Sequence, residues 1–296
     1  MRRSVLTLGA ALLATLMTAA PALACSGLIG SNGSLQLLRT TTLAAYHEGV
    51  EHYVTSFSFA GGGGEFGSLI PLPGVPSSVE AGGEWTLQRL LRETTPPPKF
   101  AFRGAVQPGA VADSAEVLLE TRIDALDLTV LRGGAAGVAE WATQHGFRLS
   151  PDAPEVLDFY ASRSPIFLAA IFDASAAAER GQQLGDGTPV HITIPTNAPW
   201  VPLRILALGK QGDERVEADV FLLTERRPSL MPLPYAEGLR LAHSAPASPS
   251  LLDDLRSDRG MEWVPADAWL TQVAIDARAA DLRYDLAIDP TGGAPS

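Results

Sequence analysis

The chain of 296 residues is poor in three things: cysteine, lysine and long apolar runs. A single cysteine, Cys25, excludes any disulfide within the chain, so stability must come from an apolar core, which a chain of this length can bury. Lysine occurs only as Lys99 and Lys210, and 33 acidic residues outnumber 22 basic ones, which gives a formal net charge of -11. So acidic a chain repels phosphate backbones, and we expect no nucleic-acid partner.

The one extended apolar run lies at the N-terminus. Arg2 and Arg3 precede the apolar stretch Val5–Met17, and Ala22–Ala24 has the small residues typical of a cleavage site. Residues 1–24 are therefore predicted to be a signal peptide that directs export by the general secretory or the twin-arginine route. The run is too short to span a membrane and no second one follows, so we expect no transmembrane segment after cleavage.

Cleavage after Ala24 would make Cys25 the first mature residue. Lipoprotein signals place an acylated cysteine there, normally with leucine three residues earlier, whereas Ala22 holds that position here and Leu23 the next. Two alternatives stay open: a free exported N-terminus, and a lipid anchor at Cys25. We expect a secreted, periplasmic or envelope-associated protein in either case.

The clearest local pattern lies between Leu43 and Pro76. Two strand-like runs, 35–46 and 51–59, flank Glu48-Gly49, and Gly49 supplies the positive φ that a two-residue hairpin turn requires. This turn pairs residues whose numbers sum to 97. It places the following side chains on a predicted core face: Tyr46, Tyr53, Phe57 and Phe59. The opposite face receives His47, Val50, His52, Ser56 and Ser58.

Periodicity and turn residues predict the remaining elements. Helices are expected over Glu84–Glu93, Ala135–His145, Ser150–Tyr160 and Leu251–Arg256, and the second should end in a left-handed cap at Gly146. Strands are expected over residues 166–173, 190–194, 201–208, 216–223, 268–275 and 282–288. Residues 117–131 change hydrophobic phase near Asp124, which indicates a bulge or two short strands, and residues 227–249 are expected to be irregular.

These elements predict an α+β fold, rich in β structure, with mixed or antiparallel sheets and a few short helices in two lobes. Residues 25–95 would form an N-terminal hairpin lobe with one helix, and residues 115–290 a larger α+β lobe. Residues 96–114, which begin with three prolines, would link them, and residues 291–296 would be a disordered tail.

Several segments together resemble one bacterial family, domain of unknown function 2330. They are Cys25-Ser26-Gly27, the hairpin leading into Gly64–Pro76, residues 127–173, Val201–Ile205 and its following hairpin, and Trp269–Val273 before Asp285. The resemblance implies an exported or envelope-associated protein without an established activity, and it supplies no catalytic residues. Many members carry a second cysteine near the mature start, and some a C-terminal membrane segment; this sequence has neither.

The glycines and prolines after the hairpin are interpreted as structural. Gly62-x-Gly64-x-x-Gly67 matches the glycine pattern of a dinucleotide-binding fingerprint. No helix is expected to follow it and hold a pyrophosphate, so no cofactor is expected. The predicted structural positions are Gly49, Gly62, Gly63, Gly64, Pro71, Pro73 and Pro76.

Histidines supply the weak chemical candidates. His47 and His52 fit neither the HExxH spacing nor its inverse, but the hairpin register sets them on one face at a Cβ separation of roughly 7 Å, within reach of a shared metal. A hydrolase site could instead assemble from distant residues, drawing on His145, His191 and His243. Asp276, Asp281 and Asp285 are candidates for an acid and base pair.

No chemistry-bearing motif survives these tests, so no catalytic residue is assigned. We expect a non-enzymatic envelope or extracellular protein that binds a partner or has a structural role, with the partner unidentified. The rivals are a hydrolase assembled from distant residues and a metal-binding protein that uses His47 and His52.

Overall fold

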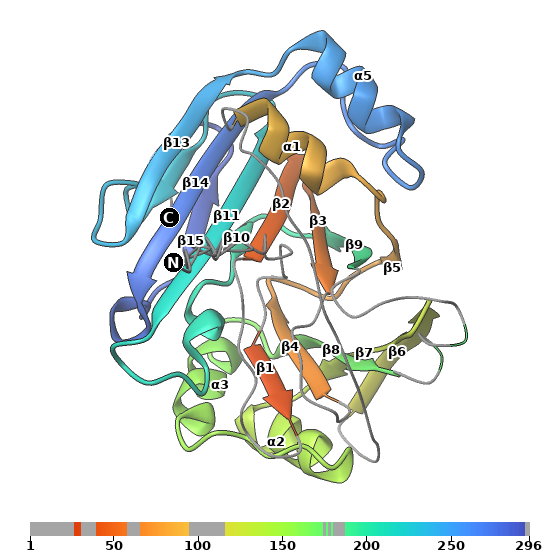
Figure 1. Cartoon of the computed structure of the whole chain (residues 1–296), viewed down its shortest axis with the longest axis vertical. Helices are drawn as coiled ribbons and strands as arrows, with labels where there is room; N and C mark the ends of the chain where they lie inside the picture. Colours follow the sequence, from red (N-terminus) through yellow and green to blue (C-terminus); the bar gives the residue numbers. More distant parts are fainter. Residues whose placement is uncertain are drawn as a thin grey trace, which may run out of the picture.

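The computed structural model describes residues 27–30, 40–57, 66–94, 116–173, 176, 179 and 187–293. The predicted signal peptide, Cys25, the three glycines Gly62, Gly63 and Gly64, and the linker 96–114 lie outside the described residues, as do residues 294–296. The described part is an α+β fold rich in strands, as predicted, with mixed and antiparallel sheets (Figure 1).

The largest sheet has seven strands in the order β13-β14-β11-β2-β3-β9-β5. All neighbours are antiparallel except β11 and β2, which run parallel. The bounds are β13 Leu239–Pro246, β14 Trp269–Arg278, β11 Arg215–Thr224, β2 Thr40–His47, β3 Val50–Phe57, β9 Thr188–Pro195 and β5 Ser78–Ala81.

The hairpin of β2 and β3 has the predicted register. Thr42 pairs with Thr55 and His47 with Val50, so that paired numbers sum to 97. Glu48 and Gly49 both take positive φ, 49° and 82°, as a tight two-residue turn demands. Tyr53 is buried on the predicted core face, and the opposite face is also buried over much of its length.

The second sheet has five strands in the order β1-β4-β8-β7-β6. Its strands are β1 Gly27–Gly30, β4 Phe66–Leu72, β8 Ile166–Phe172, β7 Leu126–Arg132 and β6 Glu116–Ile123. The phase change near Asp124 is the turn between β6 and β7, where Asp124 has φ 55°. Pro71 lies at the end of β4, beyond the residues that β1 pairs, where a missing N–H does not interrupt that ladder.

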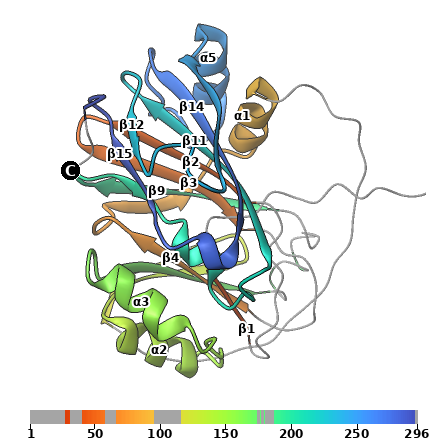
Figure 2. The ribbon, with the colours of Figure 1, turned by 90° about the vertical axis from the view of Figure 1, so that its left-hand side faces the viewer.

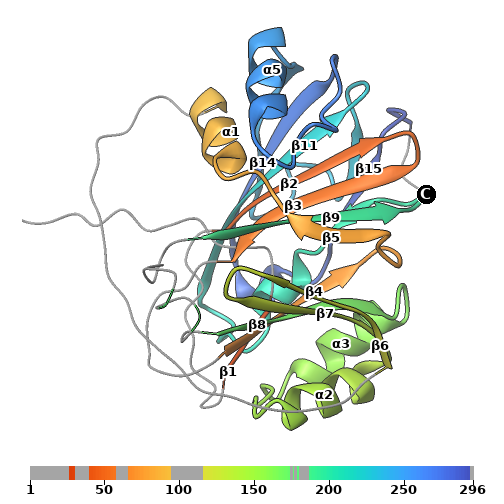
Figure 3. The same ribbon diagram turned by 90° about the vertical axis from the view of Figure 1, so that its right-hand side faces the viewer.

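Four layers result, and Figures 2 and 3 show them edge-on. Helices α1 (Thr86–Thr94) and α5 (Pro249–Ser257) cover the outer face of the seven-stranded sheet, and α2 (Ala135–Gln144) and α3 (Ala153–Ala161) cover the five-stranded sheet. The two sheets face each other across the inter-sheet core, which includes Tyr53, Ile70, Leu168, Ile192 and Val220. Alternate residues of β8 point to opposite sides, which explains its uninterrupted apolar sequence.

Helix ends follow the sequence signals in part. Gly146 has φ 72° after α2, so the left-handed cap is confirmed. Helix α3 begins at Ala153 rather than at Ser150, because Asp152 takes the N-cap position. The Asp152 carboxylate accepts a hydrogen bond from the Gly209 amide, 3.1 Å away, and so joins α3 to a distant turn.

Two predicted segments are wrong. Residues 201–208 form only the two-residue strand β10 (Trp200–Val201) and a 3₁₀ turn (Arg204–Ala207), because Asp285 binds the amides of Leu203 and Arg204. Residues 227–249 contain β12 (Ser229–Met231) and β13. Both lie at sheet edges, where prolines are tolerated.

The third sheet, β10-β15-β12, is completed by β15 (Leu286–Asp289), the shortened remainder of the strand predicted over 282–288. Strands from both sides of residues 96–114 share the seven-stranded sheet, so the predicted division between residues 25–95 and 115–290 is not a division between sheets. Within the described ranges, no helix combines the length and the apolar character that crossing a membrane requires.

Candidate functional site

A row of titratable side chains crosses the outer face of the seven-stranded sheet. Hairpin pairing sets His47 and His52 on this face as diagonal neighbours, as predicted, because His47 lies opposite Val50 and His52 opposite Ala45. On β9, His191 points the same way, since its neighbours Val190 and Ile192 point into the inter-sheet core. We call His47, His52 and His191 the histidine row.

Two members of the row contact each other directly. His52 Nδ1 lies 2.9 Å from His191 Nε2, a distance at which one ring nitrogen donates its proton and the other accepts. The hydroxyl of Thr193, which pairs with His52 across the strands, lies 3.4 Å from the same Nε2. Two ring nitrogens and a hydroxyl therefore converge between β3 and β9.

Trp263 covers the two imidazoles. Its ring stacks on His52 with centroids 4.0 Å apart and planes within 6°, and on His191 at 5.0 Å and 23°. The indole N–H donates to the Gly260 carbonyl, 3.2 Å away. Gly260 has φ 83°, and a Cβ there would lie 2.6 Å from the Ala81 carbonyl, so the loop between α5 and β14 is packed closely against β5.

Burial sets the protonation state of the pair. Loss of solvent, and secondarily the nearby His47, lowers the pKa of His52 to about 4. Burial, and secondarily His52, lowers the pKa of His191 to about 3, in keeping with a side chain only 4% exposed. Both imidazoles are therefore neutral at pH 7, and each has one protonated and one unprotonated ring nitrogen.

Glu51, one residue before His52, points into the inter-sheet core. It is fully buried, and no described side chain donates a hydrogen bond to its carboxylate oxygens. Burial raises the pKa of Glu51 to about 8, and the Trp200 backbone offsets only part of that shift. Consecutive residues of β3 thus carry a protonated acid on one face and a neutral base on the other.

The predicted metal pair is not in contact. His47 Nδ1 lies 3.3 Å from Glu225 Oε1, whereas His52 has His191 as its partner. In the part of the chain that the structure describes, no group of three or more histidine, cysteine, aspartate or glutamate side chains is arranged to hold a metal. A site shared by His47 and His52 stays a prediction.

The other sequence candidates lie apart. His145 is hydrogen-bonded to the Trp141 carbonyl at the end of α2, and His243 lies on β13 beside a register shift. Asp276 and Asp281 form separate ion pairs, with Arg215 and Arg278 respectively. The three aspartates therefore have different partners rather than one another.

Asp285 organises a buried polar network instead. Its carboxylate accepts hydrogen bonds from the Tyr160 hydroxyl at 2.7 Å, the Leu203 amide at 3.0 Å, the Arg204 amide at 3.2 Å and the Arg163 guanidinium at 2.9 Å. Burial raises the pKa of Asp285, and these hydrogen bonds oppose that rise. The network joins α3, the 3₁₀ turn and the C-terminal segment.

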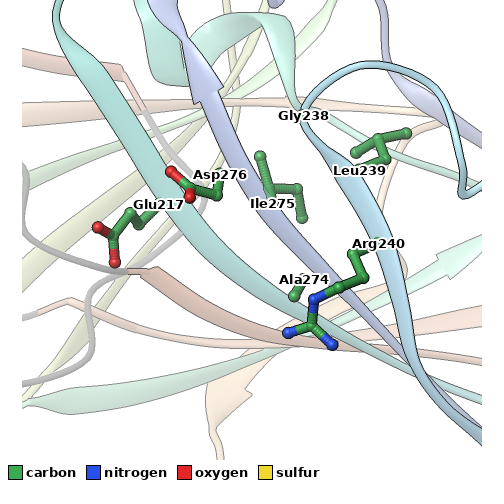
Figure 4. Close-up of a pocket in the computed structure, with 7 residues that line it drawn as sticks. All are labelled: Glu217, Gly238, Leu239, Arg240, Ala274, Ile275 and Asp276. Carbon is green, nitrogen blue, oxygen red and sulfur yellow. The ribbon is translucent and has the colours of Figure 1, made fainter.

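A groove open to solvent lies on the outer face at the end of β11, β13 and β14. Glu217 and Asp276 lie opposite each other on paired strands, and Arg240 extends from β13 next to Ala274, which it pairs with (Figure 4). Gly238, at the rim of the groove, lets the backbone before β13 pack against Ala277 of β14, because a Cβ at Gly238 would lie 2.5 Å from the Ala277 Cβ. Strand β2 separates β11, at the groove, from β3, which carries His52.

Sequence reasoning named His191 only as one possible member of a hydrolase site, not as the partner of His52, and it did not name Trp263. His191 and Trp263 lie 139 and 211 residues after His52. The alternation of residues 190–194 predicted only that His191 faces away from Val190 and Ile192. It did not predict which residue His191 contacts. Trp263 lies in a loop and offers no periodic signal.

The fold and the site define an α+β protein of two packed sheets with helices outside and a histidine–tryptophan cluster on one outer face. A family model described as an uncharacterized protein conserved in bacteria, DUF2330, matches residues 19–231. The chain belongs to this family, which confirms the resemblance seen in the sequence. A search of curated proteins finds no match.

Solved structures similar in shape include two of baculovirus P35. The crystal structure of baculovirus P35 matches with a TM-score of 0.44 and 8% identity, over 84% of this chain and 96% of that chain. A mutated baculovirus P35 after caspase cleavage, solved at 3.1 Å resolution, matches with a TM-score of 0.43 and 7% identity, over 87% and 99%. Since these TM-scores are below 0.5, no property of P35 is transferred to this chain.

Proposed function

We propose that this member of the family is an exported cell-envelope or extracellular protein with a binding role rather than a catalytic one. Export is supported by the arginine pair, the apolar run and the small residues that precede Cys25. Cys25 then either begins a free mature chain or carries a lipid anchor.

The His52–His191 pair under Trp263 carries the binding role. Two neutral imidazoles lie with one ring partly exposed and one buried, on rigid strands, and an aromatic ring fixes their orientation. Sites built on strands hold ligand groups precisely. The neighbouring hydroxyl, on Thr193, is 3.4 Å from Nε2, longer than the roughly 2.6–3.2 Å of an activated nucleophile and its base. This geometry favours binding over hydrolysis.

Cell fractionation tests the export half of the proposal. The full chain, a variant lacking residues 2–24 and Cys25→Ser would be expressed in a bacterium that is fed radiolabelled palmitate. We expect the full chain outside the cytoplasm in processed form and the shortened variant inside. Label that depends on Cys25 identifies the anchored form, and processed protein without label identifies the free form.

The binding half is tested separately by co-purification from native envelope with and without Cys25. Full-length, unprocessed protein in the cytoplasm would contradict export. A hydrolytic activity abolished by both His52→Gln and His191→Gln would contradict the non-enzymatic role.

A further inference from the structure

We propose that residues 228–236, between β12 and β13, insert their exposed apolar side chains into the headgroup region of a phospholipid bilayer, with Arg226 and Arg227 against lipid phosphates. We call residues 228–236 the proline segment. This inference goes beyond the proposed function, because it assigns a lipid surface to a part of the molecule that does not include the His52–His191 pair.

The most exposed large apolar side chains of the described residues lie together in the proline segment. Met231 is 51% exposed, Leu233 63% and Tyr235 76%, whereas no other large apolar side chain in the described ranges exceeds 43%. Together the three expose roughly 300–400 Å², about as much as the largest apolar patch on a typical monomer, and such patches are often functional.

Prolines hold these side chains outward. Met231, Leu233 and Tyr235 occupy alternate positions, and between them Pro232 is half-buried and Pro234 is buried. The Pro234 carbonyl accepts a hydrogen bond from an amide of β13, 3.1 Å away, which fastens the segment to the sheet. Because proline fixes φ, the segment loses little conformational freedom when its side chains are covered.

The backbone of the proline segment suits an apolar environment, where an unpaired N–H is costly. Three of its nine residues are prolines, which have no N–H. The amides of Tyr235 and Ala236 both donate to the Leu233 carbonyl, at 2.7 and 2.9 Å, and β12 pairs with β15. The segment can therefore leave water with few unpaired donors.

Charge around the proline segment suits a surface of lipid phosphates. The segment itself has no charged residue, and residues 225–240 contain three arginines and two glutamates, so this stretch is positive in an otherwise acidic chain. Arg226 and Arg227 are exposed, and neither guanidinium has a hydrogen bond or ion pair within the described ranges. Screening at physiological ionic strength limits electrostatic attraction to about 8 Å, so these nearby arginines outweigh the distant acidic residues.

The arginines and the apolar side chains can reach one surface together. Six residues separate Arg227 from Leu233, which is at most about 20 Å of extended chain. A flat bilayer spans that distance, and tyrosine is favoured at its interface.

A protein partner fits this surface less well. A standard protein interface buries roughly 800 Å² on each partner, about twice what the three side chains expose. Pro228 and Pro232 lie on either side of β12, an edge strand of three residues, so little backbone is free to pair with an added strand. A bilayer requires neither a complementary groove nor a strand.

The test places a reporter within the proline segment. Because Cys25 is the only cysteine, the full chain carrying Cys25→Ser and Met231→Cys can be labelled at one position with a polarity-sensitive fluorophore. Vesicles made of equal parts of phosphatidylcholine and phosphatidylglycerol should shift its emission to shorter wavelength, and lipids brominated on their acyl chains should quench it.

A fluorophore at Val117→Cys, in the same Cys25→Ser background, is the matched control. Val117 is another exposed apolar side chain, on the edge strand β6, and its fluorophore should show neither change. This control also identifies vesicle binding through the apolar run Val5–Met17, which would not bring the proline segment into the bilayer.

Variants of the Met231-labelled chain identify the apolar groups that insert. Tyr235→Asp and Leu233→Asp should each raise the vesicle concentration at the half-maximal shift at least tenfold, whereas Val75→Asp should leave it within twofold. Circular dichroism of each variant checks that it is folded, and only folded variants are compared.

The arginine pair has its own readout. Replacing both Arg226→Gln and Arg227→Gln should raise the half-maximal concentration at least threefold for the mixed vesicles. The same replacement should leave it within twofold for vesicles of phosphatidylcholine alone, and an equal effect on both kinds of vesicle would contradict the phosphate contact.

Three results would overturn the lipid contact: no emission shift at Met231→Cys, an equal shift at Val117→Cys, or a folded Tyr235→Asp chain that responds as before. Self-association that depends on Tyr235, measured by analytical ultracentrifugation and without a response to vesicles, would instead assign the segment to a contact between copies of the chain. Because fractionation tests export independently, a failure here alone would leave the proposed location intact.

Discussion

Two buried carboxylates in this protein illustrate opposite solutions to the same problem. Asp285 lies between α3, the 3₁₀ turn and the C-terminal segment and accepts four hydrogen bonds. Glu51 lies in the inter-sheet core and receives none from a described side chain. Burial raises the pKa of both carboxyl groups, and it raises that of Glu51 to about 8. The four donors of Asp285 oppose the rise in its pKa, whereas Glu51 avoids the cost of a buried charge by keeping its proton.

Replacing Asp285 should have the largest effect on stability of the substitutions considered. Asp285→Ala leaves the Tyr160 hydroxyl, two backbone amides and the Arg163 guanidinium without their acceptor. We expect the free energy of unfolding to fall by about 3–5 kcal/mol, as for a buried network that loses one member. Urea unfolding measures this loss.

Asp285→Asn is the control, because it keeps the shape and one carbonyl oxygen, and it should cost clearly less. Equal losses for both variants would show that the negative charge, rather than the acceptor geometry, stabilises the network.

Glu51 should make the stability of the protein depend on pH. Its folded-state pKa is raised from 4.5 to about 8, so its contribution is fully present below pH 4.5 and is lost as pH rises through 8. Wild-type stability should therefore fall by about 1.4 kcal/mol per pH unit within that window. Glu51→Gln cannot ionise and should gain about 3 kcal/mol on wild type between pH 5 and pH 8.

Urea unfolding of both proteins at pH 5, 6, 7 and 8 measures the difference. A difference that stays constant across these pH values would show that Glu51 is already ionised in the folded protein. Asp285→Asn serves here as the buried-carboxylate control.

Removing the indole of Trp263, which lies over the outer face of β3, should lower stability moderately. Trp263→Ala deletes the stacking on His52 and His191 and should lower the free energy of unfolding by about 2 kcal/mol. Solvent would then reach the imidazoles, so the pKa of His52 should rise from about 4 toward 6.5. Proton NMR titration of the imidazoles measures this shift, and Trp263→Phe should show a smaller one.

The smallest effect is expected at His47. Its contact with Glu225 is exposed, with side chains 40% and 52% accessible, and such surface contacts contribute little. His47→Gln should change the free energy of unfolding by less than about 0.5 kcal/mol. A loss above 1 kcal/mol would show that the whole histidine row, and not only the His52–His191 pair, stabilises the sheet.

Local order in this chain was predictable from its sequence. The hairpin register followed from one turn glycine. Strand β8 followed from a continuous apolar run, as expected for a strand whose two faces are both buried. The predicted strand over 201–208 failed, because Asp285, some 80 residues later, binds the amides that begin the 3₁₀ turn. A tertiary contact there outweighed the local preference.

The candidate site was only half predictable for the same reason. The hairpin placed His52 on the correct face, but it proposed His47 as the partner because both lie within six residues. His191 comes from a strand that pairs with β3 only after the sheet assembles, and Trp263 from a loop still later in the chain. The hairpin register also predicts that Glu51 points to the same side as Tyr53. Its complete burial was not predictable from the hairpin, because the second sheet covers that side.

The parallel pairing of β2 with β11 has a consequence for how the chain folds. Thr40 lies beside Ala218, so the first long hairpin completes its place in the sheet only when residues almost 180 positions later have been made. Such long-range pairing slows folding and leaves hairpin edges unpaired in the meantime. The N-terminal hairpin therefore cannot complete the seven-stranded sheet before the strand that holds Ala218 has been synthesised.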